Sequence, residues 1–402
     1  MPQTHYEYVI IGGGLAGVSA IEGIREIDKE GEILLAGNEK NMPYDRPPLT
    51  KKLWTGAKKI SEIFLHGNDF YKEMGAELAM GSLALELLPD DKTVIFNDGR
   101  RIRYSKLLLA TGGSPRRLDI PGGNLEEICY FRTLNDYQNI RSIAEEGRKA
   151  LIIGGGFIGS EMAAALNINK VEVTMLFPGD YLVSHVFTEE LGTSIQEHYM
   201  KRGIEIIRGD LPVSIERKEG FYLTKTKNGS EIKSDFIIAG IGILPNTGLA
   251  EKAGLLVNNG ITVNEYLQTS DTDIYSAGDN TNFILKALEK RTRVEHWDNS
   301  IWQGKTAGKN MAGGKTPFEH IPYFFSDLFE FGYEAAGELN PKLETVSLWK
   351  KEFETGIIYY MNNGNVMGIM LCNVWDKIEA AREIINKKEK FSRESIKNAI
   401  VF

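Results

Sequence analysis

The chain has 402 residues but only two cysteines, Cys129 and Cys372, which lie far apart. No two cysteines have the close spacing of a zinc ligand set, a cysteine-bound iron–sulfur cluster or a redox-active disulfide. We therefore expect no bound metal and no disulfide scaffold. Two unpaired thiols fit a reducing compartment.

Long hydrophobic runs and an excess of positive charge are also missing. The longest apolar candidate, residues 237–244, is interrupted by glycines and is far shorter than the roughly 18 residues of a membrane-spanning helix. A net charge of −8 gives no sign of nucleic acid as the main partner. The first apolar run begins at Tyr8, with no signal-peptide pattern before it. We expect a cytoplasmic protein that binds neither membranes nor nucleic acid.

Glycine, in contrast, is abundant, with 42 residues, and it recurs in two similar segments, residues 7–23 and 149–165. Each segment has a short apolar run, a glycine-rich turn and an apolar helical stretch. The spacing Gly-x-Gly-x-x-Gly is formed by Gly12, Gly14 and Gly17 and again by Gly154, Gly156 and Gly159. Such a motif binds a dinucleotide diphosphate at a helix N-terminus, although a glycine-rich turn between core elements is the alternative for either copy alone. Two copies favour two dinucleotides that exchange electrons.

The rest of the chain predicts an α/β fold with two Rossmann-like dinucleotide-binding domains and a C-terminal α+β domain. Further strands are expected at residues 32–36, 93–96, 106–110, 171–177, 204–207, 236–239 and 274–277, with a hairpin near 221–232. After Tyr323 the pattern alternates. It predicts a small antiparallel sheet with strands at 346–350, 356–361 and 365–372 and a charged helix at about 376–388.

A third motif, residues 269–279, ends in Ser-Ala-Gly278-Asp279. On its own it fits equally well a strand that closes with a Gly-Asp turn. An acid at the end of a strand is, however, well placed to accept hydrogen bonds from a polyol.

The order of these motifs resembles that of a known family. Pro-Tyr-Asp-Arg-Pro-Pro-Leu-Thr-Lys at 43–51 and Ala-Thr-Gly at 110–112 follow the first glycine motif. Gly-Ile-Leu-Pro-Asn at 242–246 and Ile-Tyr-Ser-Ala-Gly-Asp at 274–279 follow the second. The whole set is similar to the FAD-dependent pyridine nucleotide oxidoreductases, and most similar to ferredoxin and rubredoxin reductases and apoptosis-inducing factor. The resemblance covers nearly the whole chain and implies an NAD(P)H-dependent flavoprotein reductase.

The resemblance also implies roles for individual residues. Those expected to bind FAD are Gly12, Gly14, Gly17, Arg46, Lys51, Thr111, Gly112, Gly278 and Asp279, with Asp279 on the ribityl chain. Those expected to lie against the flavin are Glu295, His296, Trp297 and Phe325. Those expected to bind NAD(P)H are Gly154, Gly156, Gly159 and Glu161.

The catalytic residues implied by the resemblance are Lys51, near flavin N5, and Glu161, which would pair with it. A buried ion pair loses hydration and usually has a functional reason. The alternative is that Lys51 is one of two solvated neighbouring lysines. The resemblance further divides the chain into an FAD-binding domain at 1–118 and 245–321, an NAD(P)H-binding domain at 119–244 and a C-terminal domain at 322–402.

Two positions depart from the usual dinucleotide pattern, in which an acidic residue ends the second strand and binds the adenosine ribose. In the first domain this position falls at Glu39, or at Asn38 as a weaker substitute. In the second domain Phe177 stands there, and Asp180 is the nearest carboxylate. No arginine lies between Phe177 and Asp180 to bind a 2′-phosphate, so we expect NADH, with NADPH as the alternative.

Because the chain has no redox disulfide, the electrons must pass from the flavin to an external acceptor. The basic run Lys286, Lys290, Arg291 and Arg293 precedes Glu295, and it is a candidate docking site for an acidic iron–sulfur protein. The alternative for this run is a solvated face. Arg116 and Arg117 form a weaker candidate, and a homodimer remains an open alternative to a monomer.

Three functions follow from the resemblance. The first is a reductase that passes a hydride from NAD(P)H to FAD and then single electrons to a ferredoxin or rubredoxin. The second is a redox sensor like apoptosis-inducing factor, with slow oxidase activity. The third, an NADH oxidase or peroxidase, is disfavoured because no cysteine lies between Arg46 and Lys51, where relatives of that class carry one.

Overall fold

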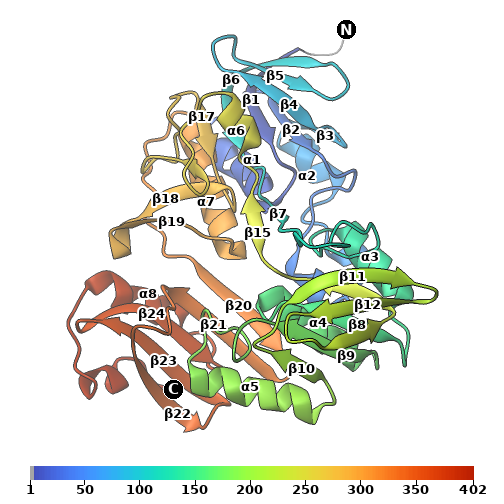
Figure 1. Cartoon of the computed structure of the whole chain (residues 1–402). Helices are drawn as coiled ribbons and strands as arrows, with labels where there is room; N and C mark the ends of the chain where they lie inside the picture. The colour runs from blue at the N-terminus through green and yellow to red at the C-terminus, as the bar shows by residue number, and fades with distance from the viewer. Residues whose placement is uncertain (1–3) are drawn as a thin grey trace. The chain divides into compact units, whose positions relative to one another are not determined.

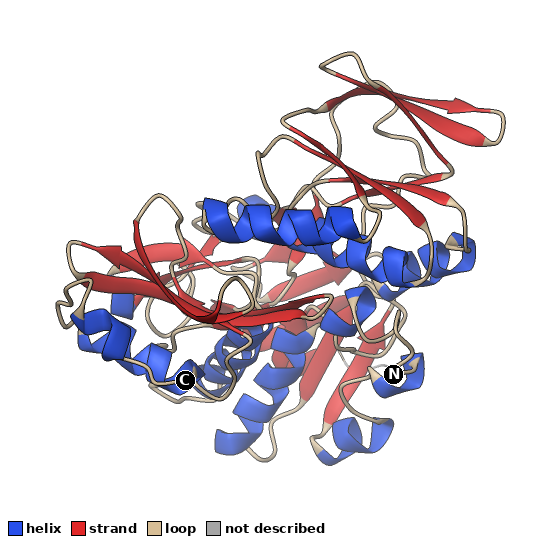
Figure 2. Cartoon of the chain, turned by 90° about the horizontal axis from the view of Figure 1, so that it is seen from below, coloured by secondary structure: helices blue, strands red, loops and turns tan. Residues whose placement is uncertain are grey.

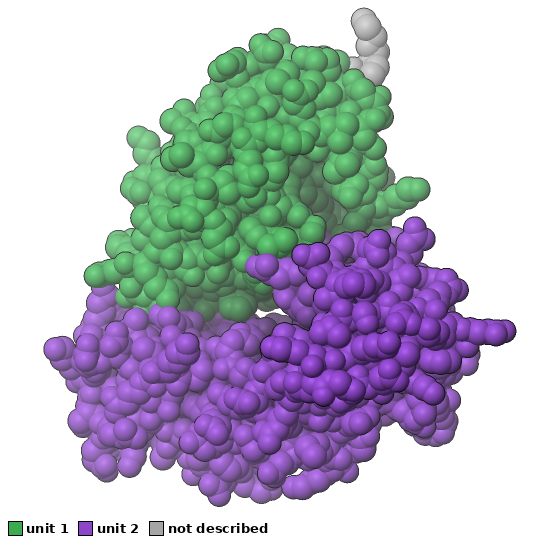
Figure 3. Space-filling view, viewed as in Figure 1, with its two compact units in different colours: residues 1–45, 61–114, 244–322 green, residues 46–60, 115–243, 323–402 purple. Residues whose placement is uncertain are grey.

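The computed structural model describes residues 4–402, and the chain divides into two compact units, which are coloured separately in Figure 3. The first unit comprises residues 1–45, 61–114 and 244–322. The second comprises residues 46–60, 115–243 and 323–402. Each unit therefore combines stretches that are far apart in the sequence.

A seven-stranded mixed sheet forms the centre of the first unit, with the order β3-β2-β1-β6-β5-β4 and β17 beside β6 (Figure 1). Its strands are β1 (His5–Ile11), β2 (Ile33–Gly37), β3 (Ala76–Met80), β4 (Ala84–Leu88), β5 (Thr93–Phe96), β6 (Arg101–Leu109) and β17 (Ile274–Ser276). Strands β1, β2, β3, β6 and β17 are parallel, and the apolar runs of β1, β2 and β6 are largely buried, as expected for strands covered on both faces.

Two helices, α1 (Leu15–Ile27) and α7 (Trp297–Met311), pack against each other at very short range. A Cβ atom on Gly304 would lie 2.2 Å from the carbonyl oxygen of Ala16, and one on Gly308 would lie 2.1 Å from that of Ala20. Glycine is therefore required in α7 for the two backbones to touch. This contact holds α7, which comes late in the sequence, against α1, the helix of the first βαβ unit of the chain.

The other elements of the first unit surround this centre. They are the helices α2 (Asn68–Glu73) and α6 (Gly248–Lys252), the strands β16 (Ile261–Thr262), β18 (Thr281–Leu285) and β19 (Lys290–Arg293), and a 3-10 turn at Lys286–Leu288. The 3-10 turn Ile60–Glu62 spans the sequence boundary between residues 60 and 61. Two short strands, β7 (Gly113–Pro115) and β15 (Ile243–Pro245), contain two of the five points at which the chain passes from one unit to the other.

The second unit begins with the 3-10 turn Pro47–Thr50 and contains a four-stranded parallel sheet of order β10-β9-β8-β14. Its strands are β8 (Lys149–Ile153), β9 (Glu172–Phe177), β10 (Glu205–Arg208) and β14 (Phe236–Ala239), and its helices are α3 (Leu134–Ile143), α4 (Phe157–Ile168) and α5 (Glu189–Lys201). An antiparallel sheet adds β11 (Pro212–Lys218), β12 (Phe221–Thr226) and β13 (Glu231–Ser234).

The C-terminal part of the second unit is a five-stranded antiparallel sheet of order β20-β21-β24-β23-β22, against which α8 packs (Figures 1 and 2). Its elements are β20 (Tyr323–Leu328), β21 (Phe331–Gly337), β22 (Glu344–Lys351), β23 (Thr355–Asn362), β24 (Asn365–Cys372), α8 (Ile378–Lys387) and a final 3-10 turn at Ser395–Asn398. No helix within residues 4–402 is both long enough and apolar enough to cross a membrane.

The expected α/β architecture with an antiparallel C-terminal domain is confirmed, and most expected strands begin and end within two residues of the observed ones. The hairpin β18–β19 was not expected, because its second strand consists of Lys290, Arg291, Thr292 and Arg293. A charged run of this kind has no hydrophobic periodicity from which to predict a strand.

The contact between α1 and α7 gives a test of the fold. Alanine usually stabilises a helix relative to glycine, but Gly304→Ala places a methyl group against the backbone of Ala16. We expect the variant to lose about 1–3 kcal/mol of unfolding free energy. Gly248→Ala is the matched control, since that glycine opens α6 with no atom within 4 Å of the added carbon. Equal thermal unfolding midpoints for the two variants would contradict the packing.

Candidate active site

The first glycine motif has the geometry of a diphosphate-binding turn. Gly12 has φ +129°, and a Cβ on it would lie 2.0 Å from the carbonyl oxygen of Ala110. A Cβ on Gly17 would lie 2.2 Å from the oxygen of Gly12. The position of a Cβ on Gly14, in contrast, is open, since no non-neighbouring atom of the described residues lies within 4 Å of it. The first and third glycines are therefore required for packing, and the second leaves room for a ligand at the start of α1.

The second motif repeats this geometry. Gly154 has φ +120°, and a Cβ on it would lie 2.3 Å from the oxygen of Gly240. A Cβ on Gly159 would lie 2.0 Å from the oxygen of Gly154. A Cβ on Gly156 would lie 3.7 Å from Cε1 of His185, the one non-neighbouring atom within 4 Å among residues 4–402. The residues of both motifs thus fit dinucleotides, one in each unit.

The other residues expected to bind FAD in the first unit meet at one edge of its sheet. Because β1, β6 and β17 are parallel and Leu109 pairs with both Ile11 and Ser276, the turns after these strands lie together. These turns contain Gly12, Thr111, Gly112 with φ +63°, Gly278 with φ +92°, and the half-buried Asp279. Ligands of open α/β sheets bind at this carboxyl edge.

Buried polar atoms at the same edge have hydrogen-bonding capacity to spare. Asn280 Nδ2 donates to the Leu109 carbonyl and to Thr111 Oγ1, both at 3.0 Å, while its Oδ1 has no partner among the described residues. Gln303 Oε1 accepts from the Gly278 N–H at 2.9 Å, while its Nε2 has no such partner. Buried polar groups are normally paired, so these atoms are available to hydrogen-bond a polar ligand at this edge.

Glu39 and the residues 295–297 lie in the same unit. The Tyr44 hydroxyl donates to Glu39 Oε2 at 2.6 Å, just after β2. Trp297 Nε1 donates to Asp45 Oδ1 at 2.8 Å, and Glu295 pairs with Arg293 at 2.6 Å. Burial lowers the pKa of His296 to about 4, so this imidazole is neutral at pH 7 despite the nearby carboxylates.

In the second unit Lys51 and Glu161 form the expected pair, with Lys51 Nζ 2.6 Å from Glu161 Oε1. Their side chains are only 12% and 6% exposed. Two hydroxyl groups complete the shell of the carboxylate. Thr50 Oγ1 donates to Oε2 and Ser326 Oγ donates to Oε1, each at 2.5 Å. Glu161 on α4 is therefore held by three donors, from residues 50 and 51 and from β20.

The segment 46–60, which carries Lys51, is fixed to the second unit at several points. Arg46 Nη1 donates to the Arg132 carbonyl at 2.9 Å. The Tyr137 hydroxyl donates to the Leu53 carbonyl at 3.3 Å, and Asn169 Nδ2 donates to that of Trp54 at 3.2 Å. Lys51 is therefore a positioned residue, and the alternative of a solvated pair of lysines does not describe it.

The aromatic residues of β20 divide between two faces of the strand. Phe324 packs edge-on against Phe157, the first residue of α4, with ring centroids 5.4 Å apart. Phe325 points to the opposite face, as alternation along a strand requires, where its ring lies 6.4 Å from that of Tyr323. Phe325 is half-buried and pairs in the sheet with Glu334.

The end of β9 shows what replaces the usual acidic residue. The Phe177 ring packs beside Gly155. A Cβ built on Gly155 would lie 2.7 Å from the nearest atom of that ring. Arg208, the residue paired with Phe177 on β10, donates to the Asp180 carbonyl at 3.0 Å. Arg208 was not found from the sequence, because it lies 28 residues after Asp180. The pairing of β10 with β9 brings it next to Asp180.

The basic run before Glu295 is largely occupied by internal contacts. Lys286 pairs with Glu319, and Arg291 Nη1 donates to the carbonyls of Val263 and Asn282 at 3.0 and 2.9 Å. Arg293 donates to the Asp279 carbonyl at 3.0 Å and is only 10% exposed. Lys286 and Arg291 remain exposed, so the run is a smaller charged surface than its sequence indicates.

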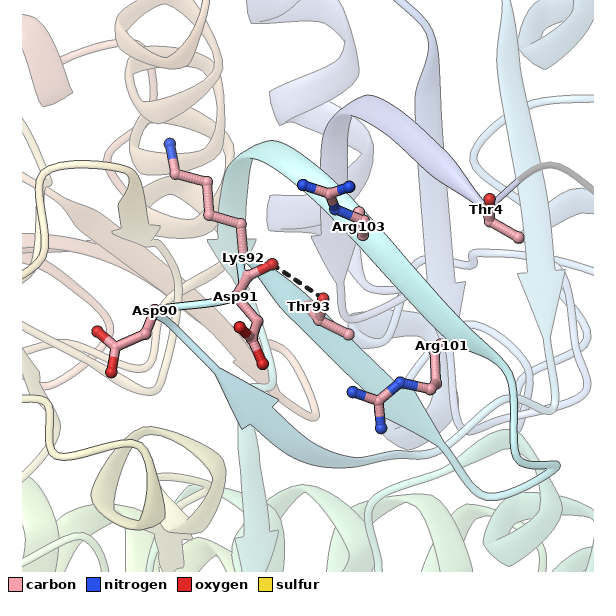
Figure 4. Close-up of a pocket in the computed structure, with 7 residues that line it drawn as sticks. All are labelled: Thr4, Asp90, Asp91, Lys92, Thr93, Arg101 and Arg103. Atoms are coloured by element: carbon pink, nitrogen blue, oxygen red, sulfur yellow. Dashed lines mark hydrogen bonds between the residues drawn. The ribbon is translucent and has the colours of Figure 1, made fainter.

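A hollow of about 610 Å³ in the first unit is not part of this site (Figure 4). Arg101 and Arg103 line it together with Asp90 and Asp91. Arg103 pairs with His5 at the amino end of β1, whereas the glycine motif follows the carboxyl end. The hollow therefore lies at the opposite edge of the sheet from the dinucleotide turn.

Comparisons with known proteins agree with this geometry. The profile of the family described as pyridine nucleotide-disulphide oxidoreductase matches residues 6–304. That of the C-terminal region of mitochondrion-associated apoptosis-inducing factor matches residues 307–354 and 349–387.

Individual relatives cover nearly the whole chain. Mitochondrial apoptosis-inducing factor 1 of Dictyostelium discoideum is 35% identical over 95% of this chain and 79% of its own length. Peroxisomal monodehydroascorbate reductase 4 of Arabidopsis thaliana is 32% identical over 91% and 79%. Among solved structures, a covalent putidaredoxin reductase–putidaredoxin complex matches with a TM-score of 0.91 and 29% identity over 97% of this chain and 95% of that chain.

The Glu161 cluster predicts a measurable coupling. Lys51→Met leaves a buried carboxylate without its cation, and we expect a loss of about 3–5 kcal/mol of unfolding free energy. Adding Glu161→Gln removes the stranded charge and should recover part of that loss. Lys149→Met, in an exposed pair with Glu172 at 3.8 Å, should cost less than about 1 kcal/mol. Additive losses for the two changes in urea denaturation would contradict the coupling.

Proposed function

The chain belongs to the pyridine nucleotide-disulphide oxidoreductase family, and from this premise we propose that it is an NADH-dependent flavoprotein reductase of an iron–sulfur protein. The observation that carries the proposal is the pair of glycine motifs. In each motif the backbone packs tightly against the first and third glycines, whereas the second glycine faces space for a ligand. When bound, FAD supplies the chemistry that accepts a hydride from NADH and releases electrons singly.

The residues of the first unit are suited to hold FAD. We infer that Gly12, Gly14 and Gly17 receive the diphosphate at the start of α1 and that Glu39 binds the adenosine ribose. Asp279 and the spare polar atoms of Asn280 and Gln303 supply hydrogen bonds for the ribityl chain and flavin. The side chains of His296 and Trp297, at the start of α7, complete the flavin side of this proposal.

The residues of the second unit are suited to hold NADH and to tune the reaction. We infer that Gly154, Gly156 and Gly159 receive its diphosphate. Glu161, with three donors, holds the Lys51 ammonium in one position, and a fixed cation stabilises negative charge that develops near it. Phe325 of β20 is the aromatic residue that the resemblance assigns to the flavin.

A reductase of an iron–sulfur partner is supported by the likeness to the putidaredoxin reductase–putidaredoxin complex, which extends over both units and the C-terminal sheet. A redox sensor like apoptosis-inducing factor is the second candidate, because a C-terminal profile of that protein matches residues within 307–387. The two differ in whether reduced protein passes electrons on quickly. The free thiols of Cys129 and Cys372 fit a reducing, cytoplasmic location.

Anaerobic rapid mixing separates these functions. We expect NADH to bleach the flavin absorbance quickly and oxidised [2Fe–2S] ferredoxin or rubredoxin to restore it quickly, with NADPH much slower in the first step. A long-lived reduced species that ignores both acceptors would support the redox sensor. Failure of NADH to reduce the protein would contradict both functions.

We further propose that the partner is acidic and meets the exposed cations Lys286 and Arg291 together with the half-buried Lys290. Reversing the charge of Lys286 and Lys290 together should raise the KM for an acidic ferredoxin several-fold at low salt, with a smaller effect at high salt. Activity with ferricyanide, a small acceptor, is the internal reference.

The matched control is the double variant Lys218→Glu with Lys225→Glu. It reverses the same number of charges on the β11–β12 hairpin, which is distant in the sequence from the basic run. An equal rise in KM for both double variants, or for both acceptors, would argue against docking at the basic run.

A further inference from the structure

The two glycine motifs differ in what faces the second glycine. A Cβ built on Gly14 would have no non-neighbouring atom within 4 Å in the part of the chain that the structure describes, whereas one built on Gly156 would lie 3.7 Å from His185 Cε1. The His185 ring also meets Phe157 edge-on, with centroids 5.1 Å apart. An imidazole therefore lies beside the start of α4, the end of the helix that attracts a dinucleotide diphosphate.

The backbone that presents His185 is strained. Val183 has φ +53°, a left-handed conformation that is rare for a β-branched residue and costs on the order of 1–3 kcal/mol. The strained turn is tied to the glycine motif, because the Val183 N–H donates to the Gly155 carbonyl at 2.8 Å. Strain that the surrounding structure maintains is characteristic of functional segments.

The other side of His185 is fixed to the C-terminal sheet. The Tyr360 hydroxyl of β23 donates to the Val186 carbonyl at 2.7 Å. The Phe187 ring is fully buried and lies 5.3 Å from that of Tyr333 on β21. His185 is thus an exposed side chain between neighbours that are buried and anchored on both sides. Its position is set before any ligand arrives.

The ring of His185 is available for a ligand. It makes no hydrogen bond or ion pair with another residue in the described part of the chain. The groups that face it, Gly156 and Phe157 of α4 with Phe324 of β20 behind them, carry no charge. Surrounding protein lowers the pKa of His185, and no neighbouring charge contributes to the shift. The free protein therefore holds a neutral imidazole here at pH 7.

We propose that His185 binds the diphosphate of the pyridine nucleotide and takes up one proton from the solvent when the nucleotide binds. The imidazolium N–H donates to a phosphate oxygen, and its positive charge offsets part of the two negative charges of the diphosphate. The proposal rests on the proposed function for the identity of the ligand. It goes beyond that function by making nucleotide affinity dependent on pH through one residue of this chain.

The sign of the dependence follows from linkage. The bound diphosphate favours the charged imidazole and raises its pKa above the lowered value of the free protein. Affinity for the nucleotide therefore rises as the pH falls through the pKa of the complex, and it levels off below the pKa of the free protein. Each pKa unit between the two states corresponds to about a tenfold change in Kd.

Isothermal titration of the FAD-loaded protein with NAD⁺, in buffers of different ionisation enthalpy between pH 6 and 8.5, tests the proposal. For the unaltered protein we expect proton uptake on binding and a Kd that falls several-fold toward pH 6. His185→Gln should bind NAD⁺ more weakly at pH 6 and without that proton uptake. His185→Lys, which keeps a cation, should bind tightly with little dependence on pH.

His198→Gln is the matched control, since it removes an exposed histidine of α5 that pairs with Glu330 at 3.3 Å. It should retain the uptake and the pH dependence. The flavin absorbance of every variant reports whether it is folded. Unchanged proton uptake in His185→Gln would overturn the role of His185 and leave the proposed function intact. No binding of NAD⁺ by the unaltered protein would overturn both.

Discussion

Glu161 is a carboxylate in the interior of the protein, and its charge has to be compensated there. A buried anion without partners is strongly destabilising, so the fold must bring donors to it. The three donors come from places that are far apart in the sequence, namely Thr50 and Lys51 before the second glycine motif and Ser326 in the C-terminal sheet. Together with the hydrogen bonds of Arg46, Tyr137 and Asn169, this requirement holds residues 46–60 in the second unit, although the first unit flanks them in the sequence.

The glycine motifs were predictable because their physics is local. A turn at φ near +120° and a Cβ position 2.0–2.3 Å from a carbonyl oxygen admit only glycine, so the spacing in the sequence reports the turn itself. The strands of the parallel sheets were predictable for a similar reason, since their apolar runs are continuous. The pairing of Lys51 with Glu161 came from resemblance, and the structure shows the contact.

The residues that sequence reasoning missed are those whose roles depend on tertiary contacts. Thr50 stands next to Lys51 and Ser326 next to Phe325, yet neither hydroxyl has a signature that separates it from other serines and threonines. Arg208 reaches Asp180 only because β10 pairs with β9. The basic run shows the opposite error, because three of its charges satisfy carbonyls or carboxylates within the same unit. The number of charged residues in a stretch of sequence therefore overestimates the number of charges exposed for a binding partner.

The family name refers to a disulphide, but the chemistry of this chain excludes a thiol route for electrons. Burial strongly raises the pKa of both Cys129 and Cys372, so neither is a thiolate at neutral pH. Cys372 lies in β24 with no exposed surface, and Cys129 is in another part of the second unit. Electron transfer through thiols needs two cysteines close enough to form a disulfide, and one of them must react as a thiolate. A bound FAD would therefore have to pass its electrons directly to an external acceptor, because the two buried cysteines supply no second redox centre.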